Sequence, residues 1–299
     1  MMLPLIFIAF SWIARADAFV SQNTVLRFLF KRMTPDCNWP VSPVNSETLE
    51  GCKYFDPSIV FPDYYLKDFH AYDGGNLNPA AAKDALSATS AVMTHHFENL
   101  SGEECSHYVR RAYSVMTRGR NVDNMEDKMF TKGTKGTVVD FGCGIGVSTK
   151  YLRDIFENDE VIGFDLSPYF LEETTGLGLP DTNFVHCNVE DTSIEPGSVD
   201  VVSISYILHE LPYDVSVRVL REASRILKPG TGVLSILDMH SPKASSPIMK
   251  YIFNRTEPYL EEYARLVRTM SSTLESIGFE DVQTSTMFPK TIMVLATKK

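Results

Sequence analysis

Three alternating glycines follow an acidic residue at the end of a short apolar run. The residues are Asp140, Gly142, Gly144 and Gly146, and a segment with helical periodicity begins directly after them. Glycines let a backbone turn tightly and lie close to a ligand, and the N-terminus of the next helix offers free N–H groups. A dinucleotide fingerprint requires one more residue before the third glycine, and the Asp140 carboxylate would repel a pyrophosphate. The loop therefore predicts a cofactor whose nearest group is cationic.

A second acidic residue, Asp165, ends the next apolar run, which starts at Val161. A carboxylate at this place can accept hydrogen bonds from both hydroxyls of a ribose. The alternative is a helix N-cap, which is the commoner role of an isolated Asp at a strand–helix boundary. Because Asp165 follows a glycine loop, we favour the ribose.

This combination of an acid, Gly-x-Gly-x-Gly and a second acid after the next strand resembles the class I S-adenosylmethionine-dependent methyltransferases. The resemblance covers roughly residues 137–299. It implies that S-adenosylmethionine is the cofactor and that Asp140 faces the methionine amino group of this cofactor. It also implies that the three glycines leave room for the cofactor and that Asp165 binds the ribose.

The resemblance further implies roles for residues after the third and fourth apolar runs. Asn188 and Val189 would bracket the adenine; the family usually has Asp at position 188, but an amide carbonyl can still accept from the adenine amino group. Tyr206 and His209 would lie near the transferred methyl, where an aromatic face stabilises a sulfonium and an imidazole can act as a general base. Alternatively, His209 only packs, since many relatives act by positioning alone.

Short apolar runs alternate with amphipathic segments from Thr137 onward, which predicts a doubly wound α/β sheet. The last two runs are separated by residues 288–290 only, so they must form an antiparallel pair. We therefore expect a mostly parallel, Rossmann-like methyltransferase sheet with an antiparallel last strand and a ligand site at its carboxyl ends. Strands are expected at 137–141, 161–164, 184–187, 199–205, 233–237, 282–287 and 291–296.

The pattern of residues 36–131 predicts an irregular and helical N-terminal appendage. Residues 132–299 are expected to form the cofactor-binding domain. Asn78 can cap a helix from Pro79, and a capping box predicts a second helix from Gly102 to about Thr117. The segment around residues 65–77 is dense in aromatic and ionisable groups, which favours a lid over the acceptor, with a structural plug as the alternative. Its candidate pocket residues are Tyr65, His70, Tyr72 and Asp73. The insertion 241–268 is a second possible wall.

The first 35 residues differ from the rest of the chain. Residues 3–14 are apolar but short for a membrane span, and Ala16-Asp17-Ala18 has the spacing of a signal-peptidase site, so residues 1–18 are interpreted as a signal peptide. Residues 19–35 begin with Phe19 and are basic without an acid, as in a transit peptide. Together they resemble the bipartite leader of algal plastid proteins, with secretion or the endomembrane lumen as the alternative. We expect residues before about 36 to contribute nothing to the fold.

The composition narrows the class of partner. With 28 basic and 38 acidic side chains, the net charge of −10 argues against a broad nucleic-acid footprint. The five cysteines are scattered and the adjacent His95 and His96 point about 100° apart on a helix, so no metal site is expected. No stable membrane span is expected in the mature chain. The sequons at Asn99 and Asn254 leave glycosylation open.

These features predict an S-adenosylmethionine-dependent methyltransferase of EC 2.1.1 type, acting on a small, partly apolar acceptor. One alternative is a catalytically inactive subunit that binds the cofactor and supports a partner. A nicotinamide-dependent oxidoreductase is disfavoured by the glycine spacing and by Asp140. The acceptor and the oligomeric state are left open.

Overall fold

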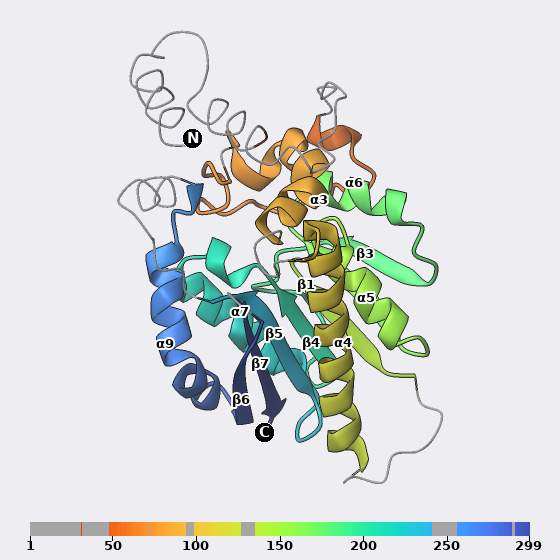
Figure 1. Cartoon of the computed structure of the whole chain (residues 1–299), viewed down its shortest axis with the longest axis vertical. Coiled ribbons are helices and arrows are strands. Elements are labelled where there is room, and N and C mark those ends of the chain that lie inside the picture. Colours follow the sequence, from red (N-terminus) through yellow and green to blue (C-terminus); the bar gives the residue numbers. More distant parts are fainter. Residues whose placement is uncertain are drawn as a thin grey trace.

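Seven strands form one sheet in the order β3-β2-β1-β4-β5-β7-β6 (Figure 1). The computed structural model describes residue 31 and residues 48–70, 72–93, 99–126, 135–240, 256–288 and 291–299. The first five strands pair in parallel, and β7 pairs antiparallel with both of its neighbours. The strands are β1 Thr137–Phe141, β2 Glu160–Asp165, β3 Thr182–His186, β4 Val201–Ser205, β5 Val233–Met239, β6 Phe279–Phe288 and β7 Thr291–Lys298.

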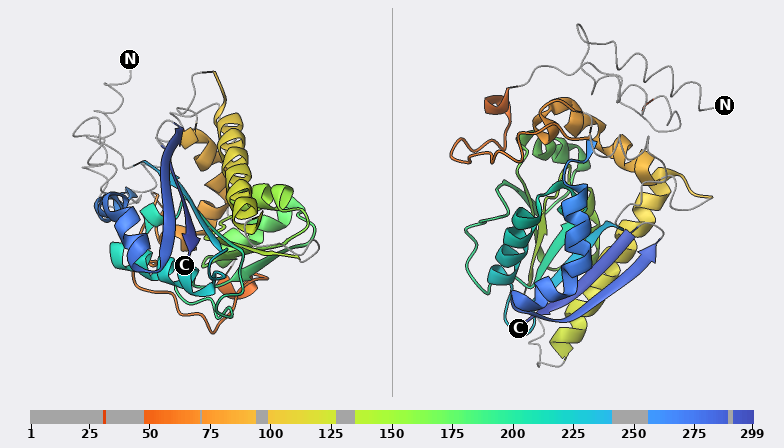
Figure 2. Two further views of the ribbon diagram at one scale, coloured as in Figure 1. Left: turned by 90° about the horizontal axis from the view of Figure 1, so that it is seen from below. Right: turned by 90° about the vertical axis from the view of Figure 1, so that its left-hand side faces the viewer.

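Helices cover both faces of this sheet (Figure 2). Alternate residues of a strand point to opposite faces, so Val139 packs in one buried cluster with α7 and α9, and Val138 packs in another with α4 and α5. The doubly wound, mostly parallel sheet with one antiparallel strand is confirmed. The helices are α3 Pro79–Met93, α4 Gly102–Glu126, α5 Val147–Ile155, α6 Pro168–Glu173, α7 Tyr213–Ile226 and α9 Leu260–Ser276; the 3-10 turns are η1 Leu49–Gly51, η2 Gly75–Leu77, η3 Thr174–Leu177 and η4 Leu208–Glu210.

The helix starts follow from local capping. The Asn78 side chain accepts from the N–H of Ala80 at 2.9 Å, at the start of α3. At the start of α4, the Glu104 carboxylate accepts from the N–H of Ser101, and the Ser101 hydroxyl accepts from the N–H of Glu104. Both helices therefore begin at the expected residue, because each cap satisfies N–H groups that lack a partner within the helix.

Helix α4 is longer than expected and packs on the sheet rather than in an appendage. It continues past Thr117 to Glu126. The Tyr113 hydroxyl bonds the Ser203 hydroxyl in β4 and the carbonyl of Ser235 in β5. Polar groups at helical spacing along α4 thus find partners in the sheet. The expected boundary between residues 131 and 132 therefore assigns α4 to the appendage, although α4 covers the sheet of the following domain.

The segment before α4 lies over the carboxyl ends of the parallel strands. The Ser167 hydroxyl after β2 donates to the carbonyl of Asn76, and the N–H of Asp56 donates to the His186 ring at the end of β3. The Lys31 ammonium lies 2.6 Å from the Asp84 carboxylate in α3. This contact joins the basic segment 19–35 to the appendage. The expectation that residues before about 36 contribute nothing to the fold did not include such a contact.

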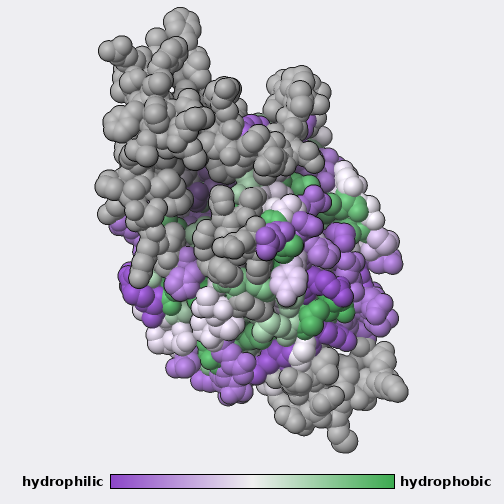
Figure 3. All heavy atoms as spheres, viewed as in Figure 1, coloured by the Kyte–Doolittle hydropathy of each residue, from purple (hydrophilic) through white to green (hydrophobic). Residues whose placement is uncertain are grey.

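The surface in Figure 3 mixes hydrophilic and hydrophobic residues. Isolated apolar side chains are exposed in the segment before β1, among them Val60 and Leu86. Within the residues that the structure describes, no helix combines the length and apolar character needed to cross a membrane.

Candidate active site

The glycine loop is held from inside the protein by Asp140, which is fully buried at the end of β1. Its carboxylate accepts hydrogen bonds from the hydroxyls of Ser148 and Thr149 at the start of α5, both at 2.7 Å, and from Ser203 in β4 at 2.9 Å. Burial raises the pKa of Asp140, and the three hydroxyls oppose this rise. Asp140 thus anchors the loop, and its direct contact with an amino group stays a prediction.

Asp165 joins the second acidic motif to the glycine loop. One carboxylate oxygen accepts from the N–H of Gly144 at 2.7 Å, and the other accepts from the N–H of Ser167 at 2.8 Å. Burial raises the pKa of Asp165 to about 6, against the effect of these two hydrogen bonds. The two motifs therefore share one edge of the sheet, and the Ser167 hydroxyl, rather than Asp165, caps α6 by accepting from the N–H of Phe170.

A buried guanidinium lies beside the end of β4. Arg110 of α4 is only 7% exposed; it donates to the hydroxyls of Ser106 and Ser205, and its Cζ lies 5.2 Å from the centroid of the Tyr206 ring. Within the described residues, no carboxylate lies at ion-pair distance from Arg110. The Tyr206 hydroxyl is also buried without a partner there. A cation and a donor left this way favour a ligand that supplies acceptors.

His209 in η4 forms a close pair with Asp238 at the end of β5. Its Nδ1 lies 2.7 Å from the Asp238 carboxylate, which also accepts from the N–H groups of Leu208 and Met239. An ionised carboxylate only accepts, so the hydrogen of this bond belongs to Nδ1 and Nε2 faces away from Asp238. Burial lowers the pKa of His209, but Asp238 and Glu210 outweigh it and raise the pKa to about 9.

The lid segment reaches this edge through Tyr65, His70 and Asn76. Asn76 donates to the Glu210 carboxylate at 2.8 Å, and His70 Nε2 lies 3.9 Å from Glu210 and 3.4 Å from Glu257. Burial raises the pKa of Tyr65, and the charges of Asp165 and Glu210 add to the effect. His70 therefore lies beside Glu210 and Glu257, and the contact of His70 and Tyr65 with an acceptor stays a prediction.

The chain resembles known proteins over the segment that carries these motifs. Residues 138–230 match the family model described as "Methyltransferase domain". This range contains the glycine loop, Asp165, Tyr206 and His209 on the sheet described above. Residues 138–230 are a class I methyltransferase domain. Over 105 residues the chain is 35% identical to the probable S-adenosylmethionine-dependent methyltransferase CRG1 of Saccharomyces cerevisiae. The aligned residues make up 33% of this chain and 34% of that protein. The match thus spans about a third of the relative.

Solved structures share the fold of the methyltransferase domain. The CurJ carbon methyltransferase has a TM-score of 0.53 at 14% identity, covering 78% of this chain and 65% of its own. Phosphoethanolamine N-methyltransferase 2 of Haemonchus contortus, in complex with S-adenosyl-L-methionine, has a TM-score of 0.51 at 15% identity, covering 82% and 61%. At these identities the likeness concerns the fold alone.

Two expected pocket residues lie away from the candidate site. The Tyr72 hydroxyl donates to the buried Asp84 carboxylate at 2.7 Å, so Tyr72 fixes α3 instead of lining the sheet edge. Asp73 is exposed, and its carbonyl accepts from the Asn78 side chain. For these two residues the plug interpretation describes the packing better than the lid.

Asn188 and Val189 lie after β3 at the same edge. The Asn188 side chain accepts from the N–H of Glu190 and donates to its carboxylate at 3.3 Å, and Val189 packs against the main core. Asn188 therefore shapes the turn after β3. Its contact with adenine stays a prediction.

Sequence reasoning missed Arg110, Asp238 and Glu257. Asp238 had a usable signal, because it ends an apolar run as Asp140 and Asp165 do. Arg110 lies on the buried face of α4 next to Val109 and Tyr113, so helical spacing could have identified it. Glu257 offers no such signal, since it lies in the insertion before α9. Of that insertion, residues 241–255 lie outside the described residues, as do His95, His96 and Asn254.

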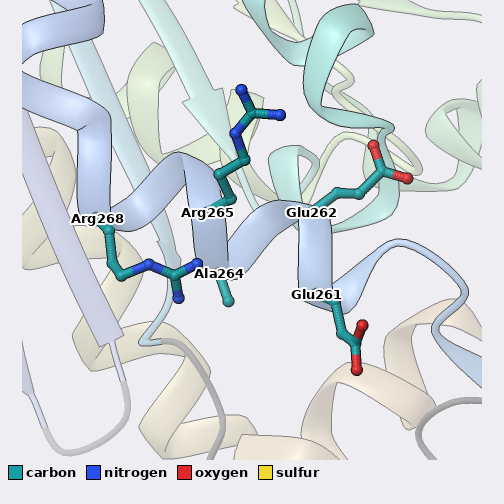
Figure 4. Close-up of a pocket in the computed structure, with 5 residues that line it drawn as sticks. All are labelled: Glu261, Glu262, Ala264, Arg265 and Arg268. Atoms are coloured by element: carbon teal, nitrogen blue, oxygen red, sulfur yellow. The ribbon is translucent and has the colours of Figure 1, made fainter.

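A surface hollow on α9 does not belong to this site. It is lined by residues of one helix only, and it includes none of the motif residues (Figure 4). The lining residues are Glu261, Glu262, Ala264, Arg265 and Arg268.

Proposed function

We propose that this chain binds S-adenosylmethionine at the carboxyl edge of the sheet and transfers its methyl group to a small, partly apolar acceptor. The observation that carries the proposal is the 2.7 Å hydrogen bond from the N–H of Gly144 to Asp165. This bond holds the glycine loop, which leaves room for the cofactor, next to Asp165, the acid suited to a ribose.

The charges around the loop suit the head group of an amino acid. Asp140 and Arg110 are buried charges of opposite sign, and their partners Ser203 and Ser205 point to the same face of β4. The methionine part of the cofactor carries an ammonium and a carboxylate. In this proposal Arg110 binds the carboxylate, which gives the buried cation the anion it lacks.

The acceptor would lie between β4 and the lid. Aromatic rings line this approach: Phe61 and Tyr65 stack with centroids 6.3 Å apart, and Tyr206 directly follows β4. They favour an acceptor with an apolar body. Asp238 holds the His209 imidazole with Nε2 toward the lid, where it can receive a proton from the acceptor once it is itself neutral. Proximity and orientation would supply most of the rate.

Calorimetry with S-adenosylmethionine tests the cofactor site. Asp165→Ala should weaken binding by about tenfold to more than a hundredfold, because a charged acceptor of two hydrogen bonds contributes roughly 1.5 to 3 kcal/mol. Asp154→Ala, which removes an exposed carboxylate in α5, is the matched control and should bind like wild type. Equal affinity of Asp165→Ala and wild type would leave Asp165 without a role in binding. Binding of NADH instead would favour the oxidoreductase alternative.

Product formation separates an enzyme from an inactive cofactor-binding subunit. The protein is incubated with a metabolite extract and S-adenosylmethionine labelled in its methyl group, and labelled products are found by mass spectrometry. Transfer of label that depends on the protein supports the enzyme. Cofactor binding with no labelled product in extracts of several sources would support the inactive subunit.

We also propose that residues 1–18 are a cleaved signal peptide and residues 19–35 a transit-like segment that together direct the protein to a plastid. Support comes from the apolar run, the A-x-A site and the basic stretch after Phe19. A fluorescent fusion of residues 1–35 in an alga with a plastid inside the endomembrane system tests this. Fluorescence in the medium or the endomembrane lumen would instead indicate secretion.

A further inference from the structure

Two imidazoles and a carboxylate from distant parts of the sequence converge beside the proposed acceptor site. His70 comes from the lid segment, and His209 and Glu210 come from η4. One ligand atom from each lies within 4.8 Å of the other two. Glu210 Oε1 is 3.9 Å from His70 Nε2 and 4.0 Å from His209 Nε2. Donor atoms bound to one ion at about 2.0–2.2 Å lie within about 4.4 Å of each other, so a small closure would complete the site.

Two of these three groups are already oriented by another residue. Asp238 accepts from His209 Nδ1 at 2.7 Å, which orients Nε2 toward the cluster. Asn76 donates to Glu210 Oε2 at 2.8 Å, so Oε1 is the oxygen nearest the imidazoles. A carboxylate on the distal nitrogen of a histidine and a hydrogen bond to a ligating carboxylate are the outer-shell arrangement of metal sites.

The local charge also favours a cation. Glu257 lies 3.4 Å from His70, and its second oxygen is buried without a partner in the described part of the chain. Within that part, the ion-pair partners of Glu210, Glu257 and Asp238 are the two histidines. Three carboxylates thus face two imidazoles, each of which is neutral or carries one additional proton and a positive charge. A divalent cation would displace such protons and supply the missing positive charge.

We propose that this cluster binds one divalent transition-metal ion through His70 Nε2, His209 Nε2 and Glu210, with Glu257 as a fourth ligand. Imidazole ligands favour ions such as Zn²⁺, Fe²⁺ or Ni²⁺ over Mg²⁺ and Ca²⁺, which prefer oxygen. The ion would tie the lid to the sheet edge and could bind an oxygen of the acceptor. No metal site was expected from the sequence, because His70 and His209 are far apart in the chain and meet only through the fold.

Metal binding is measured on the full-length, tag-free protein, independently of methyl transfer. Metal-free protein is titrated with Zn²⁺ by calorimetry, and the Co²⁺ form is examined for the visible absorption of a coordinated ion. We expect one Zn²⁺ per chain with a Kd in the micromolar range or below, and no comparable binding of Mg²⁺. His70→Ala and Glu210→Gln should each weaken Zn²⁺ binding by about tenfold or more and change the Co²⁺ spectrum.

His107→Ala is the matched control, because His107 is an exposed histidine that bonds Tyr151 on another part of the surface. It should bind Zn²⁺ like wild type. His70 and Glu210 are partly exposed, so we expect their variants to fold even if His209→Ala does not. Absence of stoichiometric Zn²⁺ binding, or equal affinity in His70→Ala, Glu210→Gln and wild type, would overturn the proposal. Metal-free protein that still binds S-adenosylmethionine shows that such a failure leaves the proposed function standing.

Discussion

The guanidinium of Arg110 lies against the ring of Tyr206, with Cζ 5.2 Å from the ring centroid, where α4 crosses the end of β4. Burial lowers the pKa of Arg110, while Tyr206 and Asp140 oppose this effect. The ring and the Ser205 hydroxyl solvate the cation only in part. A helix outside the matched segment thus brings a charge to the edge of the methyltransferase domain.

Arg110→Met should weaken S-adenosylmethionine binding by about ten- to a hundredfold, because a charge-assisted contact to the cofactor carboxylate would be lost. The same variant should be no less stable than wild type without cofactor, since it removes a buried charge that has no carboxylate partner. Calorimetry and thermal unfolding measure the two effects. Arg111→Met, which changes an exposed neighbour on the same helix, is the control. Wild-type affinity in Arg110→Met would remove Arg110 from the cofactor site.

Asp165→Asn should change how stability depends on pH. The pKa of Asp165 is about 6 in the folded protein against 3.8 ordinarily. Between these values the unfolded chain ionises first, so wild type loses about 1 to 3 kcal/mol of stability as the pH rises from 4 to 7. The Asn variant lacks this loss. The difference in Tm, variant minus wild type, should therefore increase from pH 4 to pH 7; a constant difference would contradict the raised pKa.

Gly142→Ala should destabilise the loop more than Gly144→Ala. Both glycines have positive φ, 65° and 55°, so both substitutions carry similar backbone strain. A Cβ at Gly142 would meet Ile207 Cγ2 at 2.4 Å, whereas a Cβ at Gly144 would meet only Phe170 Cδ1 at 3.6 Å. We expect an additional loss of about 1 to 3 kcal/mol in Gly142→Ala from this overlap.

A double-mutant cycle isolates the steric part of that loss. Ile207→Ala removes the atoms that the new Cβ would meet, so it should recover part of the stability lost in Gly142→Ala but none of that lost in Gly144→Ala. Urea unfolding gives the four free energies. Additive effects of Gly142→Ala and Ile207→Ala would show that backbone strain alone explains the loss.

A chain that starts at Asp36 should have nearly the Tm and cofactor affinity of the full-length protein. Lys31 of the leader forms an ion pair with Asp84, and its side chain is partly exposed, so the loss of this pair should cost no more than about 1 kcal/mol. Asp84 keeps its hydrogen bond from Tyr72. Lys31→Ala in the full-length chain tests the ion pair alone. A loss of stability much larger in the truncated chain than in Lys31→Ala would make the leader part of the fold.

The sequence determined the elements whose signals are local. A capping box needs only Ser101 and Glu104, three residues apart, and the strand β1 needs only the apolar run from Thr137 to Phe141. The short connection between β6 and β7 permits only an antiparallel pair. In each case the residues that decide the structure lie within a few positions of each other. Their pattern therefore predicts the element without knowledge of the fold.

Only the tertiary structure decided which side chains meet. It turned Tyr72 toward Asp84 and away from the sheet edge, brought Arg110 to Tyr206, and assembled His70 with Glu210. Such contacts depend on the register of the strands and the path of α4 across them, which short-range periodicity does not encode. The expected helix ended near Thr117 because nothing in the sequence nearby shows the sheet hydroxyls and carbonyls that satisfy the buried polar groups of α4.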